Sequence, residues 1–345
     1  YHFEELAGQF VIPAQSMFIR KAYLMVDLFF VMSGFIILHV YGESFARKFR
    51  WHSFLKFIRA RFARVYPLHF FMLMFIVGVY FATHEQPNPV KNLAAIPTHL
   101  LMLHSFGIHS IYTWNVPSWS ISAEWWSYML FPALALFLFR KKKSFVIVAG
   151  CLSLLIYISI MFFLPRVNPL SPEIPVPHNL DVSYDFGFLR GLSGFIIGMI
   201  IYHLYGNKKL SGFFSRDIVG IACIILTVLA LHTGANDLLC VLMFALLVFC
   251  FAANNRRINT ICKIKPLQFL GDISYSVYMI HIVIVFVVAI PIIQGMGIPY
   301  TGPKTMILDF TTGFIICLIF LAFVIGFSAL MYYSVEKPCR KWLKN

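Results

Sequence analysis

Residues 310–333, FTTGFIICLIFLAFVIGFSALMYY, carry no charged side chain, and this stretch decides the class of fold. Its 24 residues exceed the roughly 20 that an α-helix needs to cross the hydrocarbon core of a bilayer. In lipid such a segment has to be a helix, because a helix satisfies its backbone hydrogen bonds internally. Comparable, mainly apolar runs lie at 144–164, 186–205 and 274–290. The sequence therefore predicts an all-α, polytopic transmembrane helix bundle.

The composition of the whole chain agrees with this class. Of the 345 residues, 60% are hydrophobic and only 12% are charged, whereas a soluble domain has about 25% charged residues. We predict nine spans in a single membrane domain that covers residues 1–345, and an odd number of spans places residue 1 and the C-terminus on opposite sides. A further helix is expected upstream of residue 1, which makes ten in the full-length protein. The nine predicted spans are 23–42, 67–83, 118–139, 144–164, 186–205, 217–233, 237–253, 269–290 and 307–335.

The net charge of +14 has an uneven distribution along the chain. The loops on one side of the predicted membrane hold 22 of the 28 Lys and Arg residues. Such an excess marks the cytoplasmic side, so the C-terminus is expected there and the loops 84–117 and 165–185 outside. The basic charge therefore describes a membrane face and argues against a nucleic-acid groove. The loops assigned to the cytoplasm are 43–66, 140–143, 206–216, 254–268 and 336–345.

The seven cysteines follow no metal-binding spacing such as C-x-x-C, and none lies in a predicted outer loop. Their odd number and placement argue against disulfides. We expect no metal site in this chain.

Arg61 and Arg64 precede a predicted span that begins at Pro67. The segment 43–64 mixes basic and aromatic residues and predicts an amphipathic helix lying at the interface. Residues i and i+3 face the same way on a helix, and Pro67 suits the first turn of the next one, whose free N–H groups attract anions. Two guanidinium groups at this point indicate a phosphate site. The alternative is an ordinary basic anchor of a cytoplasmic loop.

Glu124 lies near the outer end of a predicted span, four residues after Ser120. A carboxylate near bilayer depth is costly, so it faces a cavity or a partner. The alternative, which the spacing favours equally, is that Glu124 accepts hydrogen bonds from the serines and only locks two helices together. Asp27 is a candidate for orienting a histidine or arginine, and Ser33-Gly34 favours close approach of another helix.

Two histidines are candidates for chemistry. His281 shares a helix face with Ser274 and Tyr278, and this face belongs either to the bundle core or to a substrate path. His2 lies outside, where an upstream helix would emerge, and a neutral imidazole accepts a hydroxyl proton. Three other histidines are five residues apart, which places them on no common helix face, so we interpret them as ordinary polar loop residues: His99, His104 and His109.

Five stretches together resemble acyltransferase family 3, bacterial membrane proteins that O-acylate cell-envelope sugars and some small molecules. They occur in the family's order, and they include Arg61-Phe-Ala-Arg64-Val-Tyr-Pro67 and Leu270-Gly-Asp-Ile-Ser-Tyr-Ser-Val-Tyr-Met-Ile-His281. The other three stretches are 26–35, 118–124 and 336–338.

The resemblance implies ten helices, a cytoplasmic acyl-CoA donor and an acceptor met toward the outer side. The family carries an Arg-x10-His motif in its first helix; His2 looks like its histidine, and the arginine would lie before residue 1. It implies that His2 is the general base, with Glu124 as a second catalytic residue. Arg61 and Arg64 would contact the donor phosphates. The residues then expected to line the substrate site are Asp27, Ser33, Trp119, Ser120, Tyr278 and His281.

The expected function is transfer of an acetyl group from cytoplasmic acyl-CoA to a hydroxyl of a cell-envelope saccharide at the outer face. O-antigen of lipopolysaccharide and exopolysaccharide are examples of such an acceptor, and Trp114 and Trp119 are candidates to hold a sugar face. Acetyl-CoA would be a substrate, with no permanently bound cofactor. The partners would be a free or lipid-linked saccharide and membrane lipid, in the bacterial inner membrane, with no nucleic acid.

Two other classes remain open at this point. A proton-coupled secondary transporter would use Glu124 and His281 as a proton relay. The other class is a non-catalytic scaffold, which applies if the upstream arginine is absent.

Overall fold

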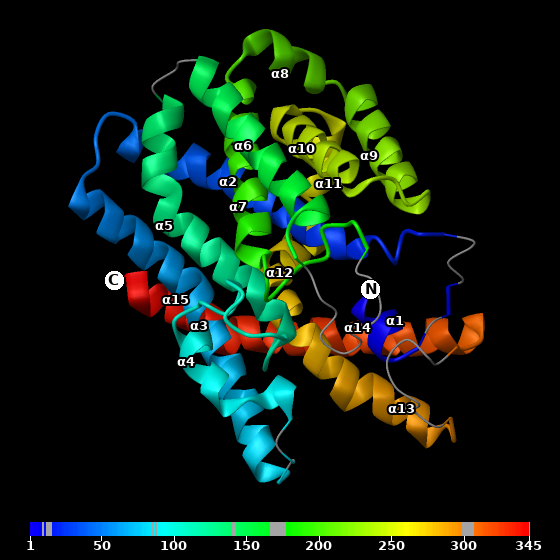
Figure 1. Cartoon of the computed structure of the whole chain (residues 1–345). Helices are drawn as coiled ribbons and strands as arrows, with labels where there is room; N and C mark the ends of the chain where they lie inside the picture. Colours follow the sequence, from blue (N-terminus) through cyan, green and yellow to red (C-terminus); the bar gives the residue numbers. More distant parts are fainter. Residues whose placement is uncertain are drawn as a thin grey trace.

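The computed structural model describes residues 1–8, 10–11, 16–84, 86, 88–139, 143–165, 177–298 and 307–344. Parts of the loops predicted at 140–143 and 165–185 lie outside these residues. Over the described ranges the regular elements are helices, which confirms the all-α class (Figure 1). The longer helices are α2 (Met25–Phe45), α3 (Trp51–Ala82), α5 (Trp119–Phe139), α6 (Lys143–Phe162), α7 (Gly187–Tyr205), α9 (Asp217–His232), α10 (Asp237–Ala253), α12 (Lys265–Ile284) and α14 (Phe310–Met331).

Short helices connect or extend the long ones. They are α1 (His2–Leu6), η1 (Ala22–Leu24), η2 (Pro89–Lys91), η3 (Leu93–Ala95), α4 (Ile96–Leu100), η4 (Val116–Ser118), α8 (Lys208–Phe214), α11 (Arg257–Cys262), η5 (Val285–Ala289), α13 (Ile290–Gly295), η6 (Tyr332–Glu336) and α15 (Lys337–Lys344). Of these, η5 and η6 are π-helical turns, which carry α12 into α13 and α14 into α15 without a break.

The number of membrane spans differs from the prediction. Each of the nine predicted ranges contains a helix, but among the described residues only six helical segments are long and apolar enough to cross a bilayer. A seventh results if α8 and α9, which are bent by 71°, form one span. The helices α6 and α10 are shorter apolar segments. The chain is therefore a multi-pass membrane protein, and the count of nine spans is not confirmed.

Helix α3 is a single element of 32 residues, and the prediction of a separate interfacial helix over 43–64 is wrong. Helix α2 takes up part of that segment, and residues from Trp51 onward are continuous with the following span. Pro67 lies inside α3, so its predicted place in a first turn is also wrong. Proline removes one backbone hydrogen bond of a helix interior but does not end this helix. The helix N-terminus expected to begin at Pro67, next to Arg61 and Arg64, is therefore not there.

Helices α2 and α7 cross at very close range near the middle of the molecule (Figure 1). A Cβ atom on Gly34 of α2 would lie 1.9 Å from the carbonyl oxygen of Phe195 in α7. A Cβ atom on Gly198 of α7 would lie 2.0 Å from the carbonyl oxygen of Val31. Only glycine permits this contact between two backbones. The close approach predicted for Ser33-Gly34 is confirmed, and it fixes the face that α2 turns toward α5.

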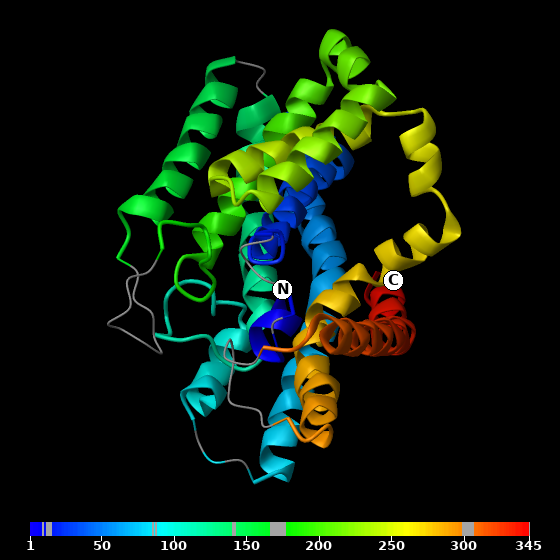
Figure 2. The ribbon, with the colours of Figure 1, turned by 90° about the vertical axis from the view of Figure 1, so that its right-hand side faces the viewer.

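The short helix α1 lies against α14, as two perpendicular views show (Figures 1 and 2). The Phe3 ring is 4% exposed, and its centroid is 5.4 Å from that of Phe320 in α14. Because Phe3 anchors α1 in this way, the preceding residue, His2, is held near α12.

Candidate functional site

A cavity of about 250 Å³ lies between α2, α3, α5 and α12. The four helices come from the first, second, third and fifth of the six spans found among the described residues, so the cavity forms only in the assembled bundle. Six of the predicted site residues belong to its lining: Ser33, Arg61, Arg64, Ser120, Glu124 and Tyr278.

The cavity is elongated along α2. It touches this helix from Val26 to Ile37, which at 1.5 Å per residue is a length of about 16 Å. Arg61 lies near the Ile37 end, because it donates to the Tyr41 hydroxyl one turn further along α2. Ser120 lies toward the Val26 end, because the ring of the preceding residue, Trp119, packs 5.9 Å from that of Phe30, and Tyr278 lies beside Ser120. These two regions are called the arginine end and the tyrosine end below.

Arg61 has few partners at the arginine end. Its Nη2 donates to the Tyr41 hydroxyl at 3.2 Å, and its guanidinium lies 5.2 and 5.9 Å from the ring centroids of Tyr41 and Tyr128. Its Nε is buried and has no hydrogen-bond partner among the described residues. A buried donor without an acceptor is costly, so this side chain is suited to an anionic ligand.

Arg64 is engaged within the protein. It forms an ion pair with Glu336, which is 1% exposed and also accepts a hydrogen bond from Ser276 Oγ at 2.9 Å. The prediction that Arg61 and Arg64 face the same way is confirmed, since both line the cavity. Their electrostatic states differ, however, because only Arg64 is neutralised by a carboxylate.

Glu124 lies in the middle of the cavity wall. One of its oxygens accepts hydrogen bonds from Ser33 Oγ at 2.7 Å and from the Tyr128 hydroxyl. The bond to Ser33 joins α5 to α2, so Glu124 links two helices while it also lines the cavity. Ser120, the serine expected to share its face, donates instead to the carbonyl of Pro117 at 3.3 Å.

The tyrosine end leads to His2. Tyr278 lines the cavity, and His281 lies one turn further along α12, with Nδ1 2.7 Å from the Tyr278 carbonyl oxygen. The His281 ring centroid is 5.0 Å from that of His2. His2 Nδ1 lies 3.4 Å from a carboxylate oxygen of Glu5, which is on the same face of α1. The predicted residues His2, Tyr278 and His281 thus form a continuous series that begins at the cavity.

Comparison with known proteins identifies the family. Residues 1–333 match the sequence model of Acyl_transf_3, described as an acyltransferase domain. The chain belongs to this family. The predicted resemblance is therefore confirmed over nearly its whole length.

Relatives of this acyltransferase-family chain match only in part. One is "Protein 2 in picA locus" of Rhizobium radiobacter, 36% identical over 82 residues, or 21% of this chain and 38% of the relative. Another is "Acyltransferase MdmB" of Streptomyces mycarofaciens, 30% identical over 110 residues, or 31% of this chain and 27% of the relative. The chain thus covers well under half of the length of these two proteins, and no solved structure matches it.

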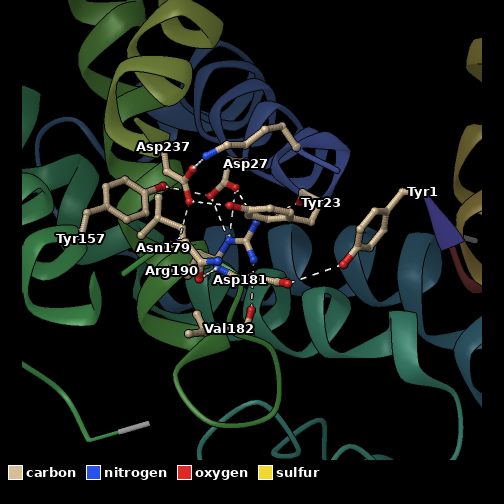
Figure 3. A network of polar contacts seen from close by, with 11 residues as sticks. Tyr1, Tyr23, Asp27, Tyr157, Asn179, Asp181, Val182, Arg190 and Asp237 are labelled. Atoms are coloured by element: carbon tan, nitrogen blue, oxygen red, sulfur yellow. Dashed lines mark hydrogen bonds and ion pairs between the residues drawn. The ribbon is translucent and has the colours of Figure 1, made fainter. Parts of the chain in front are cut away.

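Asp27 does not line the cavity of this acyltransferase-family protein. It is fully buried and pairs with Arg190 of α7, whose Nη2 lies 2.6 Å from Asp27 Oδ2 (Figure 3). Arg190 also donates to the carbonyls of Val182 and Tyr23, and the Tyr157 hydroxyl donates to Asp27 at 3.3 Å. Of the two partners considered for Asp27, the structure contains the arginine. Arg190 is absent from the predicted site residues, although a lone arginine inside an apolar run of a predicted span is a signal for such a role.

Asp237 forms a second buried acidic centre beside this pair (Figure 3). It accepts hydrogen bonds from Lys21 Nζ at 2.6 Å, from the Tyr23 hydroxyl at 2.7 Å and from the Leu180 backbone N–H at 2.7 Å. These contacts tie the start of α10 to the segment before α2.

The predicted role of Trp114 and Trp119 in holding a sugar is wrong. Trp114 is 5% exposed, and its indole N–H donates to the Asn92 carbonyl. Trp119 is 9% exposed, packs under the Arg190 guanidinium and does not belong to the cavity lining. Buried ring faces cannot stack on a sugar.

The interpretation of His99 and His104 as ordinary loop residues is also wrong. Their rings stack with centroids 3.9 Å apart, and the His69 ring of α3 stacks 5.7 Å from His104. All three are buried, and each Nε2 has an oxygen partner. The partner is the His99 carbonyl for His69, the Thr113 hydroxyl for His99 and the Ser118 hydroxyl for His104. Burial lowers the pKa of His99 well below its usual range and that of His104 to about 3.

Proposed function

We propose that this protein is a membrane O-acyltransferase that moves an acetyl group from cytoplasmic acyl-CoA to a hydroxyl of a cell-envelope saccharide. The observation that supports this best is one elongated cavity with an under-coordinated arginine at one end and a histidine series at the other. Membership of the acyltransferase family supports the reaction class. O-antigen of lipopolysaccharide and exopolysaccharide are the acceptors to be tested first.

In this proposal, acetyl-CoA binds with its phosphates at the arginine end of the cavity. A phosphate group of acetyl-CoA accepts hydrogen bonds from Arg61, whose Nε has no partner among the described residues. The donor's pantetheine arm then extends along the cavity past Glu124, and its thioester reaches the tyrosine end. Arg64 contributes its charge to the same end but keeps its ion pair with Glu336.

The acceptor hydroxyl meets the thioester next to His2. The imidazole of His2 takes the hydroxyl proton while the hydroxyl oxygen attacks the thioester carbonyl carbon. Glu5, 3.4 Å from Nδ1, favours the tautomer that carries its proton there and leaves Nε2 as the base. The same carboxylate stabilises the imidazolium that forms.

The membrane placement is part of the proposal. The C-terminus and the basic loops lie in the cytoplasm of a bacterial cell, and the acceptor side faces outward across the inner membrane. Its support is the concentration of 22 of the 28 Lys and Arg residues in loops on one predicted side.

The experiment supplies radiolabelled acetyl-CoA to full-length protein in proteoliposomes with envelope saccharides of the host. Label should enter the saccharide as an ester that mild alkali removes. His2→Ala should lower this transfer by about 10²–10⁴-fold, the usual contribution of a general base. The matched control is His52→Ala, since His52 is an exposed histidine in the first turn of α3 and does not belong to the cavity lining.

Two results would contradict the proposal. Transfer at the wild-type rate by folded His2→Ala protein would remove His2 as the base. Saccharide flux across the proteoliposome membrane without acetyl-CoA consumption would instead establish the transporter class.

A further inference from the structure

The tyrosine end of the cavity contains a hydroxyl that the steps above do not use. We propose that the Tyr278 hydroxyl is a catalytic hydrogen-bond donor to the carbonyl oxygen of the acyl thioester. This inference rests on the proposed acyl transfer and adds the group that stabilises its oxyanion.

Tyrosine hydroxyls around the cavity differ in what they bind. The Tyr128 hydroxyl donates to Glu124, and the Tyr275 hydroxyl donates to the Val65 carbonyl. The polar neighbour of the Tyr278 hydroxyl is the Ser120 hydroxyl, which also lines the cavity. A ligand carbonyl in the cavity can take the place of this uncharged neighbour as acceptor of the Tyr278 proton, without leaving a carboxylate or a backbone carbonyl unpaired.

The position of Tyr278 matches the place where donor and base have to meet. It lines the end of the cavity that lies away from Arg61, so a donor bound by its phosphates points its acyl group toward it. The next turn of α12 carries His281, whose ring lies 5.0 Å from that of His2. Tyr278 thus lies between the cavity and the proposed base.

The backbone of Tyr278 is fixed by the same arrangement. Its carbonyl oxygen lies 2.7 Å from His281 Nδ1, and the carbonyl of the next residue, Met279, accepts a hydrogen bond from Asn115 at 3.2 Å. Asn115 is buried and lies just before α5. A donor held in place before the reaction does not have to reorganise as charge develops, which is what makes such groups effective.

The chemical step is balanced without any further reactant. The acceptor oxygen forms a bond to the carbonyl carbon, and its proton moves to His2. The carbonyl oxygen becomes an oxyanion that accepts a hydrogen bond from Tyr278, which keeps its own proton. When the carbon–sulfur bond breaks, the thiolate of CoA takes the proton from His2, and the ester is released.

The first test is Tyr278→Phe, which removes the hydroxyl and keeps the ring. Loss of one oxyanion donor typically lowers kcat by about 10²–10³-fold, while donor KM should change little. A direct measurement is the infrared carbonyl band of acetyl-CoA labelled with a heavy carbonyl carbon. Bound to the wild-type protein, this band should move to lower frequency because the carbonyl accepts a hydrogen bond, and Tyr278→Phe should abolish the movement.

The matched control is Tyr66→Phe. Tyr66 lies on α3 outside the cavity lining, and its hydroxyl donates to the Leu100 carbonyl at 3.1 Å. This variant also loses one tyrosine hydroxyl in a part-buried place, so it reports any general effect of such a loss. The carbonyl band of acetyl-CoA bound to Tyr66→Phe should move as it does with the wild type.

A fluorinated tyrosine at position 278 covers the case in which Tyr278→Phe fails to fold. It keeps the hydroxyl but makes it a stronger donor, so the band should move further than in the wild type. A carbonyl band at the wild-type frequency in either folded variant would overturn the role of Tyr278 and leave the acyl transfer standing. A wild-type transfer rate in Tyr278→Phe would do the same. A wild-type protein that neither binds nor consumes acetyl-CoA would overturn both proposals.

Discussion

Two acid–arginine arrangements lie along α2, and they use their charges differently. In one arrangement, Asp27 and Arg190 are 0% and 1% exposed and satisfy each other with bidentate contacts of 2.6 and 3.2 Å. In the other arrangement, Arg61 and Glu124 line one cavity, and each is bonded to hydroxyl groups instead of to the other. The first arrangement is closed, and the second leaves hydrogen-bonding capacity for something that is not part of the chain.

The difference separates structural from functional charge in this bundle. An ionisable group inside a membrane protein is expensive, so it is retained where it holds the fold or where it serves a ligand. Arg190 has five contacts to oxygen atoms of the protein, which accounts for its burial. Arg61 has one, and its buried Nε has none among the described residues. Only Arg61 therefore keeps a desolvation cost that the protein does not offset, and a bound ligand would remove it.

The largest effect is expected from breaking the closed pair. Asp27→Leu leaves Arg190 buried without its carboxylate, and loss of one partner of a buried ion pair costs about 3–5 kcal/mol of stability. We expect a large decrease in the unfolding temperature of the solubilised protein. The double variant Asp27→Leu with Arg190→Met should recover much of the loss, because apolar residues replace the whole pair. A single variant as stable as the wild type would show that the pair is not structural.

A smaller effect, on binding, is expected at the open arrangement. Arg61→Ala should weaken acetyl-CoA binding by about 1.5–3 kcal/mol, the value of a charge-assisted hydrogen bond, with little change in stability. Arg64→Ala should lower stability as well, because it leaves Glu336 buried and unpaired. Calorimetric titration with acetyl-CoA and thermal unfolding measure the two quantities. Unchanged affinity in the folded double variant would return both arginines to the role of a cytoplasmic anchor.

The histidine stack extends the comparison to a buried cluster without opposite charges. The pKa of His104 is lowered to about 3, so the unfolded chain binds a proton near pH 6.5 that the folded protein does not. Its contribution to stability is complete above about pH 6.5 and is lost as the pH falls toward 3. At 1.36 kcal/mol per pH unit, the loss at pH 5 is about 2 kcal/mol.

His104→Gln should therefore flatten the dependence of unfolding temperature on pH between about 6.5 and 5. His52→Gln, which changes an exposed histidine, is the control and should leave the slope unchanged. Equal slopes for the wild type and His104→Gln would show that the stack is not destabilised by acid.

Periodicity within one helix was a good guide to which residues share a face. It placed Arg61 with Arg64 and Tyr278 with His281, and it marked Ser33-Gly34 as a helix contact. It does not identify the facing helix, so the partnership of Glu124 with Ser33, and not with Ser120, came only from the structure. The family resemblance supplied His2, which its position alone would not have distinguished.

The failures have physical causes of the same kind. Pro67 favours a helix start locally, but the packing of α3 in the bundle outweighs the one hydrogen bond that it removes. The stacked histidines come from α3, α4 and a loop, so no spacing in the sequence connects them. Arg190 finds Asp27 across 163 residues of chain, and pairing over such a separation depends on how α2 and α7 cross.

The length of α3 has a consequence for the lipid around the protein. Its 32 residues extend about 48 Å, whereas the hydrocarbon layer is about 30 Å thick. The helix therefore has to tilt, project beyond the acyl chains, or thin the bilayer locally. Arg61 lies ten residues from its first residue, about 15 Å along the axis, which is roughly the length in excess of the hydrocarbon layer. The depth of the arginine end below the headgroups is thus set by bilayer thickness and helix tilt together, and longer or shorter lipid tails would shift it.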